Sequence, residues 1–376
     1  MPSVAIIGTR GYPSYYGGFE TAVRRLAPYL VDAGWDVVVY GRPGAVREDD
    51  ADRDPRVESV YTRGVESKSL STLSYGLTAT RDAIRRNVDA ALVMNVANGY
   101  WLPMLKRAGI PTLVNVDGIE WDREKWGSAA KKAFYRGAKL TAKHADELVV
   151  DSRAIGARWM SEFGRDGVFL PYGGAPAEPA PTPLGLERRT YVLLIARFVP
   201  ENSIDEFFSA IPEIQAFAPV VLVGSTGYGG EFDQRAASLA NTYESVQWLG
   251  HVSDDSLLAA LWQNCGVYFH GHSVGGTNPA LVQAMATGAP IVARSTIYNT
   301  EVLDDPHQIC EPSPTSITLA IRTMLSDSDA QAVASIRNVR RAQDHYSWGE
   351  ISVGYARELE KVAKVSTDAR KMGRAT

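Results

Sequence analysis

The most constraining feature of the sequence is the stretch 267–293, which begins and ends with a short apolar, β-favouring run. Between these runs lie a Gly/His/Ser turn, the pair Gly275–Gly276, and a helical segment whose start, Asn278–Pro279, has the residue types favoured at helix N-termini. A strand that turns through glycines into a capped helix gathers unpaired N–H groups and a positive dipole end at one point. The pattern predicts a parallel α/β domain with an anion site, and phosphate is the usual ligand of such sites.

The first 40 residues predict a βαβ unit, with a strand over 4–8, a helix that ends near Gly34 and a second strand over 37–40. Three interpretations compete for the glycine loop after the first strand. A dinucleotide fingerprint is disfavoured because its glycine spacing and the acid after the second strand are missing. A Walker loop is disfavoured because Gly-Lys-Ser/Thr is absent. The third interpretation is a long loop in which the amides of Gly17 and Gly18 face a diphosphate.

The chain has 376 residues, which is enough for two domains with separate cores. Residues 175–187 are rich in Pro and Ala and disfavour regular structure, so we place the interdomain linker there. Short apolar runs alternate with helical segments on both sides of it, as in doubly wound sheets. The sequence therefore predicts an N-terminal domain over 1–180 and a C-terminal domain over 188–345.

Four motifs resemble one family. They are G-T-R-G-x-P-x-x-Y-G-G-F-E-T at 8–21, N-V-D-G-x-E-W at 115–121, H-G-H-S-V-G-G-T-N-P at 270–279 and N-x-E-V-L at 299–303. Together they resemble the family-4 retaining glycosyltransferases, and most closely their rhamnosyltransferase-like branch. The resemblance implies the GT-B fold, an α/β architecture of two Rossmann-like, doubly wound parallel-sheet domains that face a cleft. It also implies that residues 346–376 cross back onto the first domain.

The resemblance assigns roles to particular residues. It implies that the donor diphosphate contacts Gly17, Gly18, Arg197, Asn202, Gly276, Thr277 and Asn278. It implies that the nucleotide contacts Ser225, His251, Val252 and Gln283, and that the transferred sugar contacts Asp117, Gly275, Gly276 and Thr277. Asp117 and Arg197 are the catalytic candidates, as acid/base or sugar-orienting carboxylate and as diphosphate clamp. Two structural alternatives remain open, in which Asp117 caps the following helix and Arg197 forms a surface ion pair.

Three positions depart from the usual pattern of the superfamily, and one of them, Gly275 in place of a glutamate, is expected in the resembled branch. Asn202 stands where relatives carry a lysine, and Gln283 stands where they carry a glutamate. A glutamine keeps an acceptor and adds two donors, so it can still hold a ribose hydroxyl, but without charge. Because a deoxyribose asks less of that position, we favour dTDP-rhamnose as the donor over a UDP- or GDP-sugar. A nucleotide-sugar epimerase and a weakly catalytic binding partner on the same fold remain alternatives.

The resemblance also implies the chemistry and the cofactors. Retaining relatives need no protein nucleophile, because the acceptor hydroxyl enters on the leaving group's face, and a donor phosphate oxygen can take its proton. We therefore expect no metal and no cofactor beyond the nucleotide-sugar donor, and the sequence has no Asp-x-Asp in a suitable strand-end turn. The expected acceptor is a saccharide or lipid-linked saccharide of capsule or exopolysaccharide synthesis.

Residues 121–144 form a local basic stretch with seven basic and two acidic residues. Trp121, Trp126, Phe134 and Tyr135 are interleaved with the basic residues. This composition is typical of a peripheral surface that contacts anionic lipid. The alternative is an ordinary solvated helix face whose aromatic residues belong to the core.

The totals limit the remaining function classes. A net charge of −4 argues against a general nucleic-acid binder. The two cysteines, Cys265 and Cys310, lack the spacing of metal ligands and are expected to be reduced thiols. The N-terminus has no basic n-region, and no apolar run approaches the ~18 residues that a membrane span needs. We therefore expect a cytoplasmic protein that can meet the inner face of the membrane.

Overall fold

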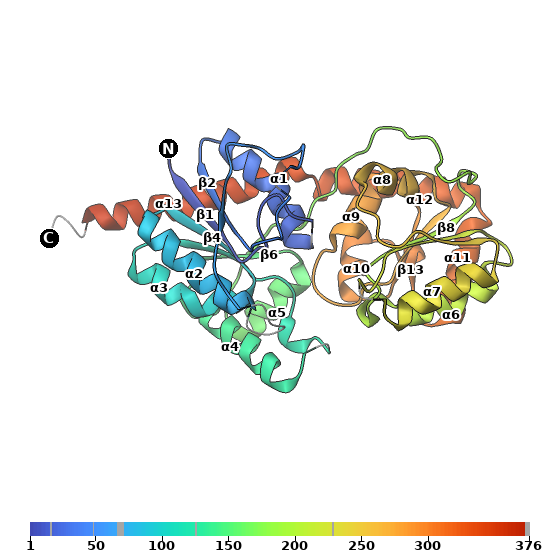
Figure 1. The fold of residues 1–376 in the computed structure, drawn as a ribbon, viewed down its shortest axis with the longest axis horizontal. Coiled ribbons are helices and arrows are strands. Elements are labelled where there is room, and N and C mark those ends of the chain that lie inside the picture. The colour runs from blue at the N-terminus through green and yellow to red at the C-terminus, as the bar shows by residue number, and fades with distance from the viewer. Residues whose placement is uncertain (16, 48, 66–70, 125, 228, 373–376) are drawn as a thin grey trace. The chain divides into compact units, whose positions relative to one another are not determined.

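The computed structural model describes residues 1–372 except 16, 48, 66–70, 125 and 228. It divides the chain into two compact units. The first comprises Met1–Tyr172 together with Trp348–Thr376, and the second comprises Gly173–Ser347. Each unit is described here by itself (Figure 1).

The first unit is built on a parallel sheet whose strands are paired in the order β3-β2-β1-β4-β5-β6-β7. The apolar runs of the sequence supply these strands, namely β1 (Ser3–Ile7), β2 (Asp36–Gly41), β3 (Glu58–Tyr61), β4 (Ala90–Met94), β5 (Thr112–Asn115), β6 (Glu147–Val150) and β7 (Val168–Phe169). Strands β1 and β4 are buried on both sides, because helices cover both faces of a parallel sheet of this kind.

Two helices that are distant in sequence cover one face of this sheet. They are α1 (Gly18–Asp32) and the C-terminal helix α13 (Trp348–Met372), and they pack against each other as well as against the strands (Figure 1). Leu359 of α13 is fully buried in the core that Leu26 of α1 shares. The remaining helices of the unit are α2 (Ser71–Arg86), α3 (Leu102–Arg107), α4 (Ser128–His144) and α5 (Arg153–Phe163), with short 3-10 turns η1 (Val96–Trp101) and η2 (Glu120–Asp122).

The second unit has its own parallel sheet, with the strand order β10-β9-β8-β11-β12-β13. The strands are β8 (Val192–Ile195), β9 (Val220–Val223), β10 (Val246–Trp248), β11 (Val267–His270), β12 (Ile291–Arg294) and β13 (Ile309–Cys310). Its helices are α6 (Ile204–Ile214), α7 (Glu231–Thr242), α8 (Asp255–Asn264), α9 (Pro279–Ala286), α10 (Ile297–Leu303), α11 (Pro314–Leu325) and α12 (Ser328–His345), with 3-10 turns η3 (Pro200–Asn202) and η4 (Pro306–Gln308). One core lies between the sheet and the helices α6, α7 and α11.

The expected linker is the main difference between the sequence prediction and the fold. Residues 175–187 contain no helix or strand, as predicted, but they belong to the second unit, which already starts at Gly173. The side chain of Gln263 in α8 accepts from the N–H of Ala180 at 3.0 Å and donates to the carbonyl of Glu178 at 2.8 Å. Because side-chain amides satisfy its backbone groups, this Pro/Ala-rich segment is fixed on its own domain instead of spanning two.

Other expected elements are present with shifted ends. The helix expected over 68–87 is α2, and its first three predicted positions lie outside the described residues. The C-terminal helix is longer than the expected 351–365, and residues 373–376 of the expected tail also lie outside the described part. Cys265 and Cys310 are buried free thiols. Within the described part of the chain, no helix is long and apolar enough to span a membrane.

Candidate functional site

The carboxyl edge of the second sheet contains a topological switch point between β8 and β11. From β8 the chain continues to β9 on one side, and from β11 it continues to β12 on the other side. The connections after the two adjacent strands therefore leave in opposite directions. In open parallel sheets, ligands bind at such a point, outside the carboxyl ends of the strands.

Arg197 lies in the connection after β8, and its side chain is exposed. Its guanidinium has no ion pair or hydrogen bond with the residues that the structure describes. The alternative of a surface ion pair is therefore not what the described structure shows. An exposed arginine at a switch point is available for an anionic ligand, and its planar fork suits phosphate oxygens.

Asn202, expected to touch the diphosphate, has another role in this structure. Its side chain is buried, with 7% of the residue exposed. Its Nδ2 donates to the carbonyl of Arg197 at 2.7 Å, and its Oδ1 lies 2.6 Å from Nδ1 of His272. A neutral amide can make both contacts, whereas a lysine could only donate. Asn202 thus joins the loops after β8 and β11 and is better described as a positioning residue.

The loop after β11 has the conformation that its glycines predicted. Gly275 has φ of +82°, a region that side-chain-bearing residues rarely adopt. A Cβ on Gly271 would lie 2.2 Å from the carbonyl oxygen of Asn202, so only glycine lets the two loops touch there. Asn278 caps α9 by accepting from the N–H of Ala280 at 2.9 Å, and Pro279 occupies the first helical position.

The predicted diphosphate contacts Gly276, Thr277 and Asn278 therefore lie directly before the N-terminus of α9. Asn278 uses its side-chain oxygen for the cap, and the side chain of Thr277 is buried. What these residues can offer to an anion is thus mainly backbone N–H groups and the dipole of the helix. Their contact with a diphosphate stays a prediction.

Gln283, predicted to hold the nucleotide, has a backbone partner that the sequence did not indicate. Its Nε2 donates to the carbonyl of Ala175 at 2.8 Å, and its Oε1 accepts from the N–H of the same residue at 3.0 Å. The carboxamide therefore pins the start of the 175–187 segment onto α9. One N–H and one lone pair remain for a ribose hydroxyl.

The predicted base-binding loops follow β9 and β10. The N–H of Gly224 donates to the carbonyl of Gly250 at 2.7 Å, which places the two loops side by side. Ser225 uses its hydroxyl to accept from the N–H of Gly227 at 2.8 Å. His251 is exposed and Val252 is half-buried. Contact with a base through backbone groups at these positions stays a prediction.

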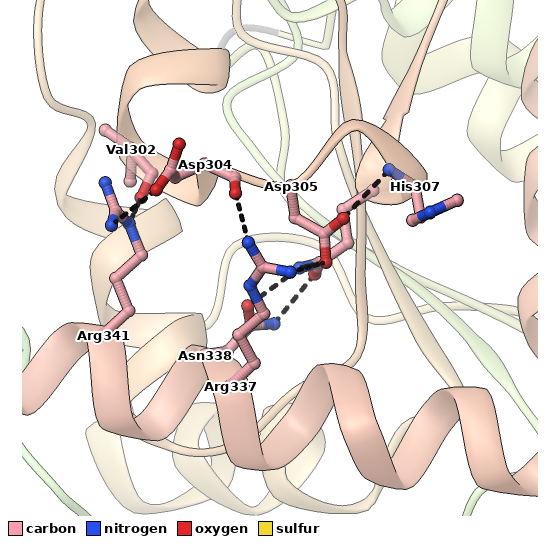
Figure 2. A network of polar contacts seen from close by, with 8 residues as sticks. Val302, Asp304, Asp305, His307, Arg337, Asn338 and Arg341 are labelled. Atoms are coloured by element: carbon pink, nitrogen blue, oxygen red, sulfur yellow. Dashed lines mark hydrogen bonds and ion pairs between the residues drawn. The ribbon is translucent and has the colours of Figure 1, made fainter.

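Helix α10 is fixed at both ends beside this edge. At its start, Nδ2 of Asn299 donates to the carbonyls of His272 and Arg294, each at 2.9 Å, and so ties the loops after β11 and β12 together. At its end, Arg341 of α12 donates to the carbonyl of Val302 at 2.6 Å, and Arg337 forms an ion pair with Asp305 (Figure 2). The last carbonyls of a helix lack partners within the helix and attract cations, which explains the two arginines at this end of α10.

In the first unit, Gly17 and Gly18 lie at the N-terminus of α1. Gly17 is the N-cap residue, no side chain caps it, and Gly18 is the first helical residue. Glu20 in the first turn reaches back to the N–H of Arg10 at 2.9 Å and orders the loop from β1. The two glycines therefore present N–H groups at a helix N-terminus, and their contact with a diphosphate stays a prediction.

Asp117 follows β5 and is held in a strained conformation, with φ of +61°. Its Oδ2 accepts from Nδ2 of Asn95, which follows β4 and also has a positive φ of 71°, at 3.0 Å. Its own N–H donates to Oδ1 of Asn115 at 2.9 Å. Non-glycine residues in this region cost about 1–3 kcal/mol each, and such strain clusters at functional sites.

Asp117 does not cap a helix, so the structural alternative for this residue is wrong. The next turn, η2, has Ile119 as its N-cap residue and no side-chain cap. Burial, and then the nearby charge of Glu120, raise the pKa of Asp117, while Arg123 and Asn95 oppose the rise. Asn95 was missed, although it obeys the rule that drew attention to Asp117: a polar residue directly after a buried parallel strand.

Of the four aromatic residues of 121–144, Trp121 is buried and the other three are half-buried. Trp121 is buried with 7% exposed, and its ring lies 5.8 Å from that of Tyr135 and 6.3 Å from that of Trp159. Trp126 and Phe134 pair with each other at 5.2 Å. Trp121 and Tyr135 therefore belong to a ring cluster between η2, α4 and α5, whereas Trp126 and Phe134 contact each other, and contact of this stretch with lipid stays a prediction. Lys125 of the basic stretch lies outside the described residues.

Comparisons with known proteins agree with this architecture. Residues 17–173 match the family described as "Glycosyl transferase 4-like domain", and residues 189–327 match "Glycosyl transferases group 1". The structure resembles sucrose-phosphate synthase from Thermosynechococcus elongatus, with a TM-score of 0.77, 18% identity and 100% of both chains covered. It also resembles HepE from Anabaena in complex with UDP-glucose, with a TM-score of 0.74, 15% identity, and 96% and 100% covered.

A relative in sequence is the GDP-mannose-dependent alpha-(1-6)-phosphatidylinositol monomannoside mannosyltransferase of Mycolicibacterium smegmatis. It is 26% identical over 226 residues, which cover 54% of this chain and 59% of that protein. The match thus spans about three-fifths of the relative's length. The two domain matches and the two parallel sheets show that the chain belongs to the glycosyltransferases with the GT-B fold. The predicted fold class is confirmed.

Proposed function

We propose that the protein transfers a sugar from a nucleoside-diphosphate sugar to a saccharide or lipid-linked saccharide acceptor in cell-surface polysaccharide synthesis. The observation that carries the proposal is the switch point of the second sheet. There, the exposed Arg197 and the glycine loop that leads into α9 follow adjacent strands. A cation and backbone N–H groups at one sheet edge are the groups that a diphosphate requires.

The chemistry follows from the charge that the reaction creates. As the bond between the anomeric carbon and the phosphate oxygen breaks, negative charge grows on the diphosphate, and Arg197 with the N–H groups before α9 stabilises it. The acceptor oxygen forms the new bond on the same face of the sugar, and its proton passes to the departing phosphate oxygen. This retaining route requires no protein nucleophile, metal or further cofactor.

Asp117 would orient a sugar hydroxyl or accept its proton. Its hydrogen bond to Asn95 and the strained backbone on which it sits hold the carboxylate in one position. Within the described residues, no group of three His, Cys, Asp or Glu side chains is arranged to hold a metal ion.

For the donor, dTDP-rhamnose is our first candidate, since Gln283 offers only a neutral amide that is already shared with Ala175. A UDP- or GDP-sugar is the alternative, and the names of the relatives mention both GDP-mannose and UDP-glucose. A thermal-shift screen with dTDP, UDP, GDP and NAD, followed by calorimetry and turnover of the matching sugars, decides between them. We expect stabilisation by dTDP.

Three other outcomes of these experiments would contradict the proposal. Stabilisation by NAD alone, or by no nucleotide, would mean that the switch-point edge is not a nucleoside-diphosphate site. Donor binding without transfer to any saccharide would favour the binding-partner interpretation. Isomerised nucleotide sugar in the absence of an acceptor would favour the epimerase.

We further propose that α4 contacts anionic lipid through a purely basic stripe. Lys132, Arg136, Lys139 and Lys143 are exposed and follow one another at helical spacings of three and four, so they share one face. Cations near a surface of anionic lipid contribute about 1 kcal/mol each. The contact would be mainly electrostatic, because the aromatic residues of this stretch are buried or half-buried and pack against one another.

Charge reversal tests this surface. Lys132→Glu with Arg136→Glu should weaken sedimentation with vesicles of phosphatidylcholine and phosphatidylserine, and leave transfer to a soluble acceptor unchanged. Arg340→Glu, on the exposed side of α12, is the matched control. Equal vesicle binding by all three proteins would refute the lipid contact.

A further inference from the structure

Arg294 is a cation at the carboxyl edge of the second sheet that the sequence did not single out. It is the last residue of β12 and is half-buried. Its Nη1 donates to the hydroxyl of Ser203 at 2.9 Å, and that hydroxyl donates to the carbonyl of Gly271 at 2.8 Å. Ser203 belongs to the connection between β8 and α6. The side chain of Arg294 therefore crosses the end of β11. Its guanidinium lies beside the loop that contains Arg197.

The charge of Arg294 is not neutralised by the described part of the protein. Its guanidinium is bonded there to a hydroxyl only, and no carboxylate of the described residues pairs with it. Asp205, two positions after Ser203, is paired with Arg235 instead. A partly buried cation without a counter-ion is unfavourable unless a ligand supplies the negative charge.

The strand order explains why two arginines can serve one ligand. β8, β11 and β12 are neighbours, so the ends of β8 and β12 are separated by two strand spacings, about 10 Å. The glycine loop before α9 leaves from the strand between them. Asn202 stands where relatives carry a lysine, but it is neutral and buried. It therefore adds no cation to Arg197 and Arg294.

We propose that Arg294 is a second diphosphate-binding residue, which acts with Arg197 from the opposite side of the β11 loop. The inference rests on the proposed function. Arginine forms paired, charge-assisted hydrogen bonds with phosphate oxygens, and one N–H of Arg294 can stay on Ser203 while the others reach the ligand. The same cation would stabilise the diphosphate as it leaves.

The strand end that carries Arg294 is held firmly. Asn299 donates to the carbonyl of Arg294 and to that of His272, so β12 cannot move independently of the β11 loop. Asn299 lies on α10, whose far end is anchored by Arg341 and Arg337 of α12, as Figure 2 shows. Such support fixes the position of a binding group before the ligand arrives.

Calorimetric titration of Arg294→Gln tests the proposal. The unmodified protein is first titrated with dTDP, UDP and GDP, and the diphosphate that binds is then compared with its monophosphate and its nucleoside. We expect the variant to lose about tenfold or more in affinity for the diphosphate, which corresponds to about 1.4 kcal/mol. The loss should be smaller for the monophosphate and absent for the nucleoside, and added salt should weaken diphosphate binding less steeply than in the unmodified protein.

The matched control is Arg322→Gln, which removes an exposed cation of the same unit that is paired with Glu213. It should bind all three ligands like the unmodified protein. Equal affinity of Arg294→Gln for the diphosphate would overturn the proposal, and so would an equal loss for the nucleoside, which marks a structural role. If Arg294→Gln does not fold, Arg294→Lys is used in its place. Its affinities for the diphosphate, the monophosphate and the nucleoside are compared in the same way. If the unmodified protein binds none of the diphosphates, the proposed function itself fails.

Discussion

Replacing Gln283 by glutamate separates the structural role of this residue from its predicted nucleotide contact. In the structure, its Nε2 donates to the carbonyl of Ala175 and its Oε1 accepts from the N–H of Ala175. An ionised glutamate could keep the second bond only. Its other oxygen would face the carbonyl oxygen at the distance of the present hydrogen bond, 2.8 Å. A protonated glutamate could restore both bonds, so the cost of Gln283→Glu must depend on pH.

The expected magnitude follows from these two bonds. Losing one hydrogen bond costs about 1 kcal/mol, and an acceptor left facing an acceptor adds about 1–3 kcal/mol. Both residues are partly exposed, so solvent reduces the second cost. We expect a loss of about 2 kcal/mol in unfolding free energy at pH 7.5. By linkage, this loss means that the pKa of the glutamate side chain in the folded protein lies about 1.5 units above its unfolded value of about 4.3.

The sign is set by the raised pKa of the folded state. A group of this kind contributes stability that is fully present below its unfolded pKa and is lost as pH rises through its folded pKa. The Gln283→Glu protein should therefore approach the unmodified protein near pH 4.5 and fall below it by pH 7.5. For a unit of this size, about 2 kcal/mol corresponds to a shift in Tm of about 4–8 °C.

Scanning calorimetry at several pH values provides the assay, and Gln283→Met provides the control. Methionine removes both hydrogen bonds at every pH, so its deficit in Tm should not change with pH. A glutamate variant that is as stable as the unmodified protein at pH 7.5, or whose deficit is the same at all pH values, would refute the reasoning. Gln283 would then be free to bind the nucleotide with its whole carboxamide.

Three further predictions concern the two units separately. Arg197→Ala should lower kcat by ~10² or more, the range for removing a positioned charge stabiliser; unchanged turnover would remove Arg197 from the mechanism. Asn95→Leu should raise the pKa of Asp117 further, because Asn95 donates to its carboxylate. The acid limb of kcat/KM should then move upward by about one pH unit, a typical effect of a hydrogen bond to a charged group. Leu359→Ala, at a fully buried site of α13, should destabilise the first unit by about 2–5 kcal/mol, measured by denaturant unfolding.

Much of the fold could be predicted because parallel strands in a doubly wound sheet are buried on both faces. Such strands read as uninterrupted apolar runs, and the run Ala90–Met94 has the same bounds as β4. The short edge strand β13 was missed because two residues carry no periodic signal. Helix α5 was also missed, although Ser152 caps it and Gly164 ends it in a left-handed conformation.

The site was predictable where a residue type implies a backbone conformation, and less so where a side chain chooses among partners. Asn278 as a helix cap and Gly275 in a glycine-specific conformation follow from local rules. The bonds of Gln283 to Ala175, a residue 108 positions earlier, depend on how the 175–187 segment lies on α9. A Pro/Ala-rich composition indicates the absence of regular structure, but it does not say which surface the segment follows.

The polar residues of the second unit's switch-point edge suggest one principle for the whole edge. Asn202, Asn278, Gln283 and Asn299 are amides, and the side chain of each is already hydrogen-bonded to a loop or to the start of α9. Amides donate and accept at once, so they can join loops without adding charge. The charge that a ligand meets at this edge then comes from arginines and from helix N-termini. If so, binding of the nucleoside part should be nearly independent of salt, while binding of the diphosphate should carry almost the entire salt dependence.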